Sequence, residues 1–485
     1  MYDNERNSQL EDGPAKIPRE LIQFLNQNTY SLLIKGHAGT GKTTLALTIL
    51  RELDVKTNCL YISTRISPEQ LFQYYSWLEK FFNKPKKTEL TEVPEAESDV
   101  PVFLDSRLDE PGSLFERITN ELMDVKAPTI IIDSWDAVGL FMDKEALMNN
   151  VRVLQMWRER SGAKIIFITE AAADATLDFL VDGVVELNQK YYNDRKVREI
   201  FLSKLRGVRI NRPSYIFSLD KGLFRSYDCY NLAQFSLDEN SKPSKNNIVN
   251  TPLLTRNSLI PTGYHQLDDL LGGGFPKNGI VSIELDTHVN TKVAMTFLRG
   301  IVSNFTSNRN IVLFQPFEGV DPAYIFQYFG LSDSYSKSLL KVFLPINKSR
   351  KISYHLSEQG IDESKKQMEN YYKTILKLKR KYPNKLLLNI LGSDVAEVLQ
   401  KNENRSGLKY LISFIKSHSA ITIFMLRTSQ SNLRGYLSEI SDVHLRILEI
   451  NGALFLQSEI PWSNLYAIVP ETNSQYADIT FEPIV

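Results

Sequence analysis

The chain has 485 residues, more than one hydrophobic core organises, so we expect roughly two to four domains. Its 42% hydrophobic and 24% charged residues are typical of a globular protein. Basic and acidic residues number 57 each, and this zero net charge removes the usual electrostatic signature of nucleic-acid binding without excluding it. No apolar run reaches the ~18 residues of a membrane span, and the polar N-terminus is no secretory signal, so we expect no membrane association and a cytoplasmic location.

Apolar runs alternate with helical periodicity in the first half of the sequence. Short runs that predict strands lie at 31–35, 59–63, 129–133, 164–169, 184–187 and 199–205. The segment 44–53 has helical spacing, and the last two runs are expected to pair across the polar turn 191–196. This order predicts an α/β domain with a mainly parallel sheet. Residues 83–101 are rich in Pro and Glu and are expected to form a mobile surface loop.

The same pattern returns after a polar segment. Residues 236–252 have the composition of a linker. The runs that follow lie at 279–285, 310–314, 385–391, 420–426 and 453–460, and most repeat the earlier order at a spacing of about 250 residues. We therefore predict two tandem α/β domains, at 1–235 and 259–485, joined by a linker at 236–258. The two cysteines, Cys59 and Cys229, are expected to be small core residues.

A glycine-rich loop follows the first predicted strand. Residues 36–43, GHAGTGKT, satisfy the pattern G-x-x-x-x-G-K-[ST] between a strand and a helix, which is the context of a phosphate-binding Walker A loop. Its glycines let backbone N–H groups face phosphate oxygens, Lys42 brings a positive charge to the last two phosphates, and the Thr43 hydroxyl is a magnesium ligand. The expected ATP contacts are Gly36, His37, Ala38, Gly39, Thr40, Gly41, Lys42, Thr43 and Thr44.

Magnesium bound to a triphosphate also needs a carboxylate at a neighbouring strand end. Asp133 ends the apolar run 129–133 and is expected to fill that role beside Thr43. The alternative is a helix N-cap, which Ser134 provides equally well. ATP and Mg²⁺ are thus the expected cofactors.

The motifs GTGKTTLAL, IIIDSWDAV and VDGVVEL…FLSKLRGVR resemble the RecA superfamily of P-loop ATPases and, within it, the KaiC-like branch. Residues 260–279 are similar to the segment that opens many KaiC-like domains. LYISTRISPEQLF and KLRGVRINRPSYIFSL resemble the archaeal branch that includes the gas-vesicle regulator GvpD. The resemblance covers nearly the whole chain and implies two tandem RecA-like domains. It does not imply that gas vesicles are involved, because one fold serves many functions.

KaiC-like ATPases form rings in which a K-x-R pair reaches the phosphates bound by the neighbouring subunit. Lys204 and Arg206 match that pair, so the resemblance implies a homo-oligomer in which both residues act in trans. A cation supplied in this way accelerates hydrolysis by ~10³–10⁵. The alternative is an exposed basic pair on an edge strand.

KaiC-like enzymes also carry paired glutamates after the second strand, one of which prepares the attacking water. This chain has Arg65 and Ile66 there, and neither accepts a proton at neutral pH. Loss of a general base costs ~10²–10⁴ in rate. Glu69 is expected in the first turn of a helix, whereas Glu170 ends the strand 164–169 and joins Lys42 and Asp133 as a candidate catalytic residue. We expect ATP binding with slow hydrolysis.

The second domain lacks this chemistry. No glycine lies between Gly279 and Gly300, so the Walker A glycines have no counterparts, and Lys292 matches Lys42 in only one register. Asn389 or Gly392 replaces Asp133, and the neighbourhood of 458–460 replaces the basic pair. The second domain is expected not to bind ATP. Residues 365–385 predict an amphipathic surface helix, with a basic patch for nucleic acid or an acidic partner as the alternative.

Three functions remain open at this stage. The first is a regulatory ATP switch in an oligomer that works with a protein partner, and the second is a RadA-like recombination ATPase acting on DNA. Against the second are the neutral charge and the lack of a recognisable DNA-binding module before the loop. The third is a protein kinase, for which no phosphate acceptor is evident. We favour the switch.

Overall fold

The structure is a computed structural model. It describes residues 16–82, 102–107, 118, 122, 125–139, 142, 144–170, 176–235, 259–316, 320–331, 334–343, 358–392, 405–429, 431–471 and 478–485. The loop predicted at 83–101 and the linker predicted at 236–258 lie outside these residues.

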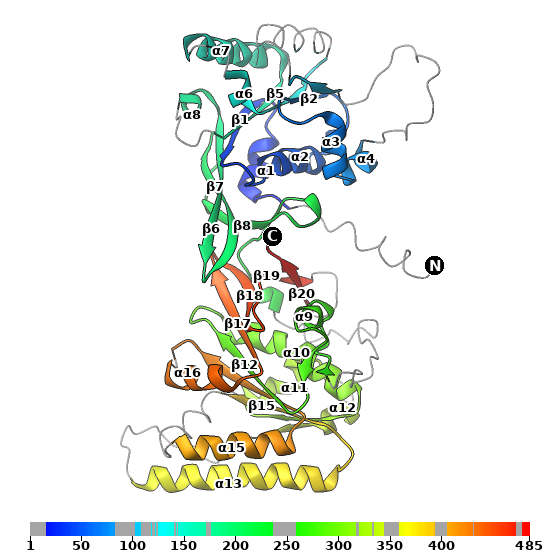
Figure 1. The fold of residues 1–485 in the computed structure, drawn as a ribbon, viewed down its shortest axis with the longest axis vertical. Helices are drawn as coiled ribbons and strands as arrows, with labels where there is room; N and C mark the ends of the chain where they lie inside the picture. Colours follow the sequence, from blue (N-terminus) through cyan, green and yellow to red (C-terminus); the bar gives the residue numbers. More distant parts are fainter. Residues whose placement is uncertain are drawn as a thin grey trace. The chain divides into compact units, whose positions relative to one another are not determined.

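Two compact units divide the chain, and each is described by itself (Figure 1). Unit 1 comprises residues 1–228 and 484–485, and unit 2 comprises residues 229–483. The division falls after Asp228, so residues 229–235 pack with unit 2. Phe235 lies in the core of that unit and is 1% exposed.

Unit 1 is a three-layer α/β unit. Its helices are α1 (Arg19–Leu25), α2 (Lys42–Glu52), α3 (Pro68–Tyr74), α4 (Trp77–Phe81), α6 (Trp135–Gly139), α7 (Lys144–Ser161) and α8 (Thr176–Leu180). Its strands are β1 (Tyr30–Gly36), β2 (Cys59–Ser63), β3 (Val102–Asp105), β4 (Thr129–Asp133), β5 (Lys164–Thr169), β6 (Gly183–Tyr192), β7 (Arg195–Leu205), β8 (Ser214–Ser218) and β9 (Arg225–Ser226). They form one sheet in the order β3-β2-β4-β5-β1-β6-β7-β8-β9, parallel up to β6 and antiparallel from β6 to β9.

The apolar runs form strands because both faces of the parallel sheet are covered. Helices α1 to α4 lie on one face, and α6 and α7 lie on the other (Figure 1). In β1, Leu32 and Ile34 pack toward the first set of helices and Leu33 toward the second. Alternate residues of one strand thus enter different cores.

Unit 2 repeats this architecture. Its helices are α9 (His265–Leu270), α10 (Thr291–Ser307), α11 (Ile325–Tyr328), α12 (Ser334–Leu339), α13 (Glu358–Lys381), α15 (Arg405–His418) and α16 (Ser431–Ile440). Its main strands are β12 (Gly279–Leu285), β13 (Ile311–Phe314), β14 (Leu340–Val342), β15 (Leu387–Gly392), β16 (Ile421–Arg427), β17 (Val443–Ile450), β18 (Ala453–Ile460), β19 (Leu465–Glu471) and β20 (Asp478–Pro483). A separate hairpin pairs β10 (Leu259–Ile260) with β11 (Phe275–Pro276).

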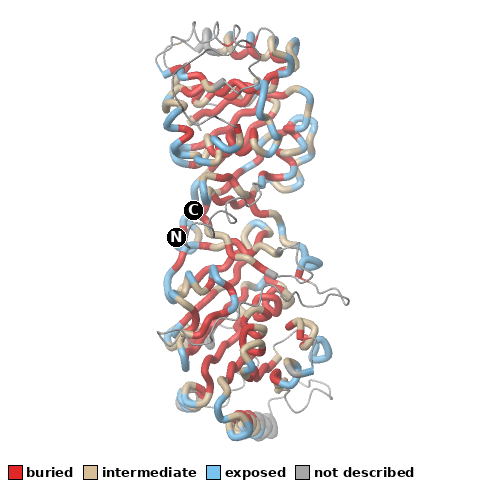
Figure 2. Tube along the Cα trace, turned by 90° about the vertical axis from the view of Figure 1, so that its right-hand side faces the viewer, coloured by how far each residue is buried: buried red, intermediate tan, exposed pale blue. Residues whose placement is uncertain are grey.

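The second large sheet has the order β14-β13-β15-β16-β12-β17-β18-β19-β20, which matches the first sheet strand for strand. Both sheets carry a register shift where the antiparallel part begins, at Val184/Val185 and at His444/Leu445. In each unit the buried residues follow the central strands (Figure 2). The predicted pair of α/β domains with mainly parallel sheets is confirmed.

A buried charge at the penultimate position of the central strand distinguishes the two units. In unit 1, the Lys35 ammonium lies 2.8 Å from Asp178 and 3.6 Å from Glu186. In unit 2, the corresponding residue of β12 is Glu284, whose carboxylate lies 2.9 Å from Arg434, 3.3 Å from His444 and 3.5 Å from Arg446. Since Arg446 pairs with Glu284 on β17 as Glu186 pairs with Lys35 on β6, unit 2 has the same ion-pair network with reversed charges.

Burial alone would raise the pKa of Glu284. The hydrogen bond from His444 and the charges of Arg446 and Arg434 outweigh this effect and lower the pKa. Glu284 therefore stays ionised although its side chain is fully buried. Removal of one partner would leave a buried charge without full compensation.

The expectation that both cysteines are core residues is half right. Cys59 lies on β2 and is 3% exposed, whereas Cys229 is exposed. Cys229 lies outside any helix or strand, against the turn at Gly452, so no sheet or helix layer covers it. The segment 365–385 forms the last part of α13 and the turn after it, and buries Tyr371, Ile375 and Leu378. None of the described helices has the length and apolar composition required to cross a membrane.

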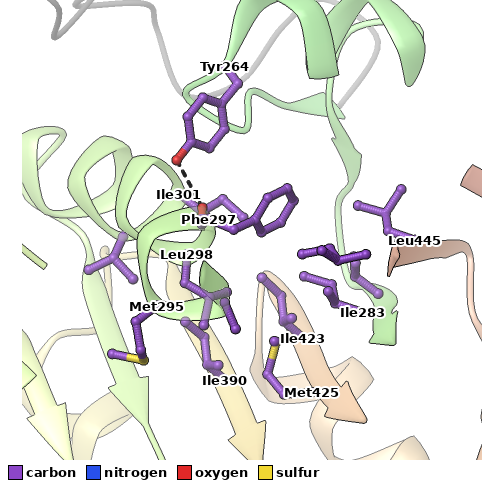
Figure 3. Close-up of a cluster of buried hydrophobic side chains, with 14 of the residues drawn as sticks. Tyr264, Ile283, Met295, Phe297, Leu298, Ile301, Ile390, Ile423, Met425 and Leu445 are labelled. Carbon is purple, nitrogen blue, oxygen red and sulfur yellow. Dashed lines mark hydrogen bonds between the residues drawn. The ribbon is translucent and has the colours of Figure 1, made fainter. Parts of the chain in front are cut away.

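Tyr264, the residue before helix α9, packs and forms hydrogen bonds against helix α10. Its hydroxyl donates to the carbonyl oxygens of Thr296 and Phe297, at 3.1 and 3.0 Å, and accepts from the Gly300 N–H. Its ring lies beside Phe297 in the apolar cluster that joins α10 to the sheet (Figure 3). A Cβ at Gly300 would lie 2.6 Å from the Tyr264 hydroxyl, so only glycine fits in that turn of the helix.

The first prediction uses this close approach. Gly300→Ala should lower the free energy of unfolding of unit 2 by about 1–3 kcal/mol, because the methyl group collides with the Tyr264 ring. Denaturant unfolding measures the change. Gly435→Ala is the matched control, since Gly435 lies in α16 with open space around it and should be neutral or gain up to ~1 kcal/mol of helix propensity. Equal effects of both substitutions would contradict the packing argument.

Candidate functional site

The loop between β1 and α2 has the backbone of a phosphate cradle. Gly41 precedes helix α2 with φ of 102°, a conformation that disfavours other residues. A Cβ there would also lie 2.7 Å from the Leu219 side chain. A Cβ on Gly36 would collide with the Leu187 carbonyl oxygen on β6. The glycines of the pattern thus have steric reasons at both ends of the loop.

Lys42 is folded over this loop. Its ammonium donates to the carbonyl oxygens of Gly36 and His37, at 2.7 and 2.9 Å, and the residue is 7% exposed. Burial lowers the pKa of Lys42, and the nearby charges of Glu170 and Asp133 oppose that shift. A buried cation ringed by carbonyl oxygens and carboxylates is a suitable partner for phosphate oxygens.

Asp133 lies beside the loop, as predicted from its strand end. The Thr43 hydroxyl donates to Asp133 Oδ2 at 2.6 Å. The expected reason, adjacency of the two strands, is wrong: β5 lies between β4 and β1. The contact forms because the carboxyl ends of all these parallel strands meet at one edge, and α2 begins there.

Tyr61 is a member of this group that the sequence did not reveal. From β2, its hydroxyl donates to the same Asp133 Oδ2 at 2.7 Å. Burial, followed by the charge of Asp133, raises the pKa of Tyr61 well above its ordinary value, so the hydroxyl stays protonated and donates. An aromatic residue inside an apolar run is the ordinary pattern of a core strand, and this is why it was missed.

Asp136 is a second residue that was missed. Its carboxylate accepts from the Thr169 hydroxyl and from the Glu170 N–H, both at 2.5 Å. It therefore fixes the end of β5 from which Glu170 extends. The motif IIIDSWDAV contains both aspartates, but only the fold shows that the second one holds the neighbouring strand.

Arg65 occupies the place of the missing glutamates and pairs with Glu170. The guanidinium Nη1 lies 2.5 Å from Glu170 Oε1, and the two side chains are 44% and 33% exposed. The hydrogen bond from Arg65 is the main reason why the pKa of Glu170 is lowered. A carboxylate held in this way is a weaker base. Glu69 lies in the first turn of α3, as expected, and Ile66 packs partly buried against the core.

The basic pair at the end of β7, Lys204 and Arg206, makes contacts within its own unit. Lys204 donates to the carbonyl oxygens of Asp178 and Val181, at 2.8 and 2.6 Å. Arg206 lies 3.1 Å from Asp182, and its side chain is 60% exposed. The trans-acting role expected for both residues stays a prediction.

Two side chains of the β6–β7 hairpin hold the tip of the loop. Gln189 and Arg198 both donate to the Gly39 carbonyl oxygen, at 2.8 and 2.7 Å. Neither was expected to lie near the loop, because they come from strands about 150 residues further along the chain. The β6–β7 hairpin thus contacts the Walker A loop directly, at Gly39.

The corresponding loop of unit 2 keeps the geometry and loses the chemistry. Asn290 is the N-cap of α10 as Gly41 is of α2, and a turn from Val289 N–H to Asp286 O matches the turn from Thr40 N–H to His37 O. In this register Thr291 stands in the place of Lys42 and Lys292 in the place of Thr43. The register in which Lys292 matches Lys42 is therefore wrong.

In unit 2 the Arg427 guanidinium donates hydrogen bonds to the loop that corresponds to the Walker A loop. Arg427, at the end of β16, stands where unit 1 has Glu170. It donates to the carbonyl oxygens of Asp286 and Val289, at 3.3 and 2.7 Å, and to the Thr291 hydroxyl at 3.0 Å. The Asp286 carbonyl corresponds to that of His37, which Lys42 contacts in unit 1, and the Val289 carbonyl corresponds to that of Thr40.

The remaining counterparts follow from the strand registers. Gly392 rather than Asn389 corresponds to Asp133, and Phe314 corresponds to Tyr61 without its hydroxyl. Ile460 pairs with His444 as Lys204 pairs with Val184, so an apolar side chain replaces the first cation of the basic pair.

The family described as "GvpD gas vesicle protein, P-loop domain" matches residues 21–203. This part of unit 1 is similar to the GvpD-type P-loop domain. Over 98% of its length the chain is 23% identical to Protein GvpD2 of Halobacterium salinarum, of which it covers 97%. It is 30% identical to Protein GvpD1 of the same organism over 63% of the chain and 58% of that protein. The circadian clock oscillator protein KaiC of Thermostichus vulcanus is 25% identical over 51% of the chain and 46% of its own length.

The side chains of Thr43 and Asp133 are too few to hold Mg²⁺ by themselves, so the ion would bind together with a nucleotide. Thr43 and Asp133 offer one hydroxyl and one carboxylate within hydrogen-bond distance of each other, which are ligand types that Mg²⁺ accepts. No group of three or more His, Cys, Asp or Glu side chains able to hold a metal ion occurs among the described residues. Phosphate oxygens would have to complete the coordination.

The second prediction concerns Tyr61. Tyr61→Phe should weaken the Mg²⁺-dependent part of nucleotide affinity by about tenfold, because Asp133 loses the donor that fixes its orientation. Nucleotide titrations over a range of Mg²⁺ concentrations measure the effect. Tyr75→Phe is the control, since the Tyr75 hydroxyl bonds Thr44 and not the carboxylate. An unchanged Mg²⁺ dependence in Tyr61→Phe would exclude this role.

Proposed function

We propose that the chain is an ATP-binding regulatory protein in which the P-loop domain is a switch that hydrolyses ATP slowly. The proposal rests on the hydrogen bond from the Thr43 hydroxyl to Asp133, which lies beside the loop over which the Lys42 ammonium is folded. That set provides a phosphate cradle, a cation and a magnesium-binding pair at one sheet edge. Unit 2, with Arg427 in its loop, serves as scaffold or partner surface.

Slow turnover follows from Arg65 and Ile66, which stand where KaiC-like enzymes carry paired glutamates and do not accept a proton at neutral pH. Glu170 is the remaining candidate base, and before a nucleotide binds it is held by a hydrogen bond from Arg65. One group of relatives is named for gas vesicles and the other for a circadian clock, and neither name refers to a metabolic reaction. For this chain we propose a nucleotide-dependent switch that acts on a protein partner.

The third prediction tests nucleotide binding. The intact chain should bind one Mg-ATP per chain, and Lys42→Ala should abolish binding because the loop loses its only phosphate-directed ammonium. Calorimetric titration gives both stoichiometry and affinity. Turnover should lie roughly 10²–10⁴ below the ~10 s⁻¹ of a median enzyme. Lys56→Ala, at an exposed lysine paired with Asp54, is the control. Two nucleotides per chain, or brisk turnover, would contradict the proposal.

The fourth prediction tests assembly. We propose that Mg-ATP promotes a homo-oligomer and that Arg206 then acts on the nucleotide of the neighbouring subunit. Arg206→Ala should lower the residual turnover by at least tenfold and leave the affinity of the isolated subunit for ATP within about twofold. Light scattering with and without Mg-ATP gives the mass. Arg209→Ala, at a nearby exposed arginine, should behave as the unchanged protein. A mass that ignores nucleotide would count against the oligomeric switch.

A further inference from the structure

The Arg65–Glu170 ion pair lies where a terminal phosphate would enter the site. Both residues follow the carboxyl ends of parallel strands, β2 and β5, at the edge where Lys42 begins helix α2. Both also perturb the pKa of Lys42: the Glu170 charge raises it and the Arg65 charge lowers it. By contrast Arg107 is an exposed arginine that follows the edge strand β3 and pairs with Asp105.

The backbone next to each residue of the pair is hydrogen-bonded, while both side chains are partly exposed. The Thr64 N–H donates to the Asp133 carbonyl oxygen at 2.8 Å, and the Thr64 hydroxyl accepts from the Ser134 N–H at 2.7 Å. The Asp136 carboxylate accepts from the Glu170 N–H. Arg65 thus directly follows a residue that is bound to the end of β4, and its own side chain is 44% exposed.

The charges of the site favour an exchange of partners. Two cations, Lys42 and Arg65, face the three carboxylates of Asp133, Asp136 and Glu170. Arg65 is therefore the cation that a bound triphosphate competes for, because Lys42 already points into the loop. A guanidinium forms paired hydrogen bonds with phosphate as readily as with carboxylate.

Resting on the function proposed above, we propose that Arg65 is the group that distinguishes a nucleoside triphosphate from a diphosphate. With a diphosphate, Arg65 stays on Glu170. With a triphosphate, its guanidinium leaves Glu170 for the terminal phosphate. Glu170 is then a positioning residue that holds Arg65 in the diphosphate state. No bond is made or broken covalently in this exchange.

The fifth prediction is a change in nucleotide preference. Arg65→Ala in the full chain should weaken binding of Mg²⁺ with β,γ-imido-ATP by ~10–100-fold and leave Mg-ADP binding within about twofold, because only the triphosphate gains the guanidinium. Arg65→Lys should keep part of the preference, since a lysine has the charge without the paired donors. Glu170→Gln should tighten binding of the triphosphate analogue alone, because it frees Arg65 in advance.

The matched control is Arg107→Ala. It breaks an arginine–carboxylate pair of the same kind, with Asp105 at 2.7 Å and nearly equal exposure, at the same sheet edge. Its ratio of ADP to triphosphate affinity should equal that of the unchanged protein. Thermal unfolding without nucleotide shows whether each variant is folded.

Three outcomes would overturn the proposal. A parallel loss of affinity for both nucleotides in Arg65→Ala would assign Arg65 a structural role only. An unchanged affinity for the triphosphate analogue would remove Arg65 from the site. If the unchanged protein bound neither nucleotide, the proposed function itself would fail, and this result differs from the other two because no variant is needed to observe it.

Discussion

A buried charge at the end of the central strand constrains both halves of this protein. The strand is covered on both faces, so a charged residue there must find partners inside the sheet edge or lose several kcal/mol of stability. Lys35 meets this demand with Asp178 and Glu186, and Glu284 meets it with Arg434, His444 and Arg446. The partners come from the helix before the next strand and from that strand itself. Each network therefore ties the end of the central strand to the antiparallel part of its sheet.

Unit 2 keeps the fold of the loop without its phosphate-binding chemistry. What the backbone requires is a turn of fixed length and an N-cap for the following helix, and Asn290 supplies the cap through its side chain. What a phosphate requires is a set of N–H groups without obstructing side chains and a cation that points inward. Unit 2 retains the first and places Arg427 in the second role. The Arg427 side chain of the same unit thus occupies this loop.

In unit 1 the same edge combines rigid and exchangeable contacts. Asp133 is held by Thr43 and Tyr61, and Asp136 holds the end of β5, so the metal-directed carboxylate and its neighbour have fixed positions. Arg65 and Glu170 are half-exposed and bound mainly to each other. A switch needs both kinds of contact: a pair of side chains that changes partners when the ligand changes, and rigid surroundings that respond to this change.

The sequence alone determined most of the parallel strands, the phosphate loop and the duplication, because each depends on a local pattern. Buried parallel strands require continuous apolar runs, and a loop around phosphate requires glycines at set positions. The tertiary structure decided which side chains meet at the strand ends. Tyr61 on β2, Asp136 in α6 and Glu170 after β5 lie far apart in the chain, and the place of Lys292 depended on the register of a whole sheet. No local pattern records those pairings, because they are set by the order in which parallel strands associate.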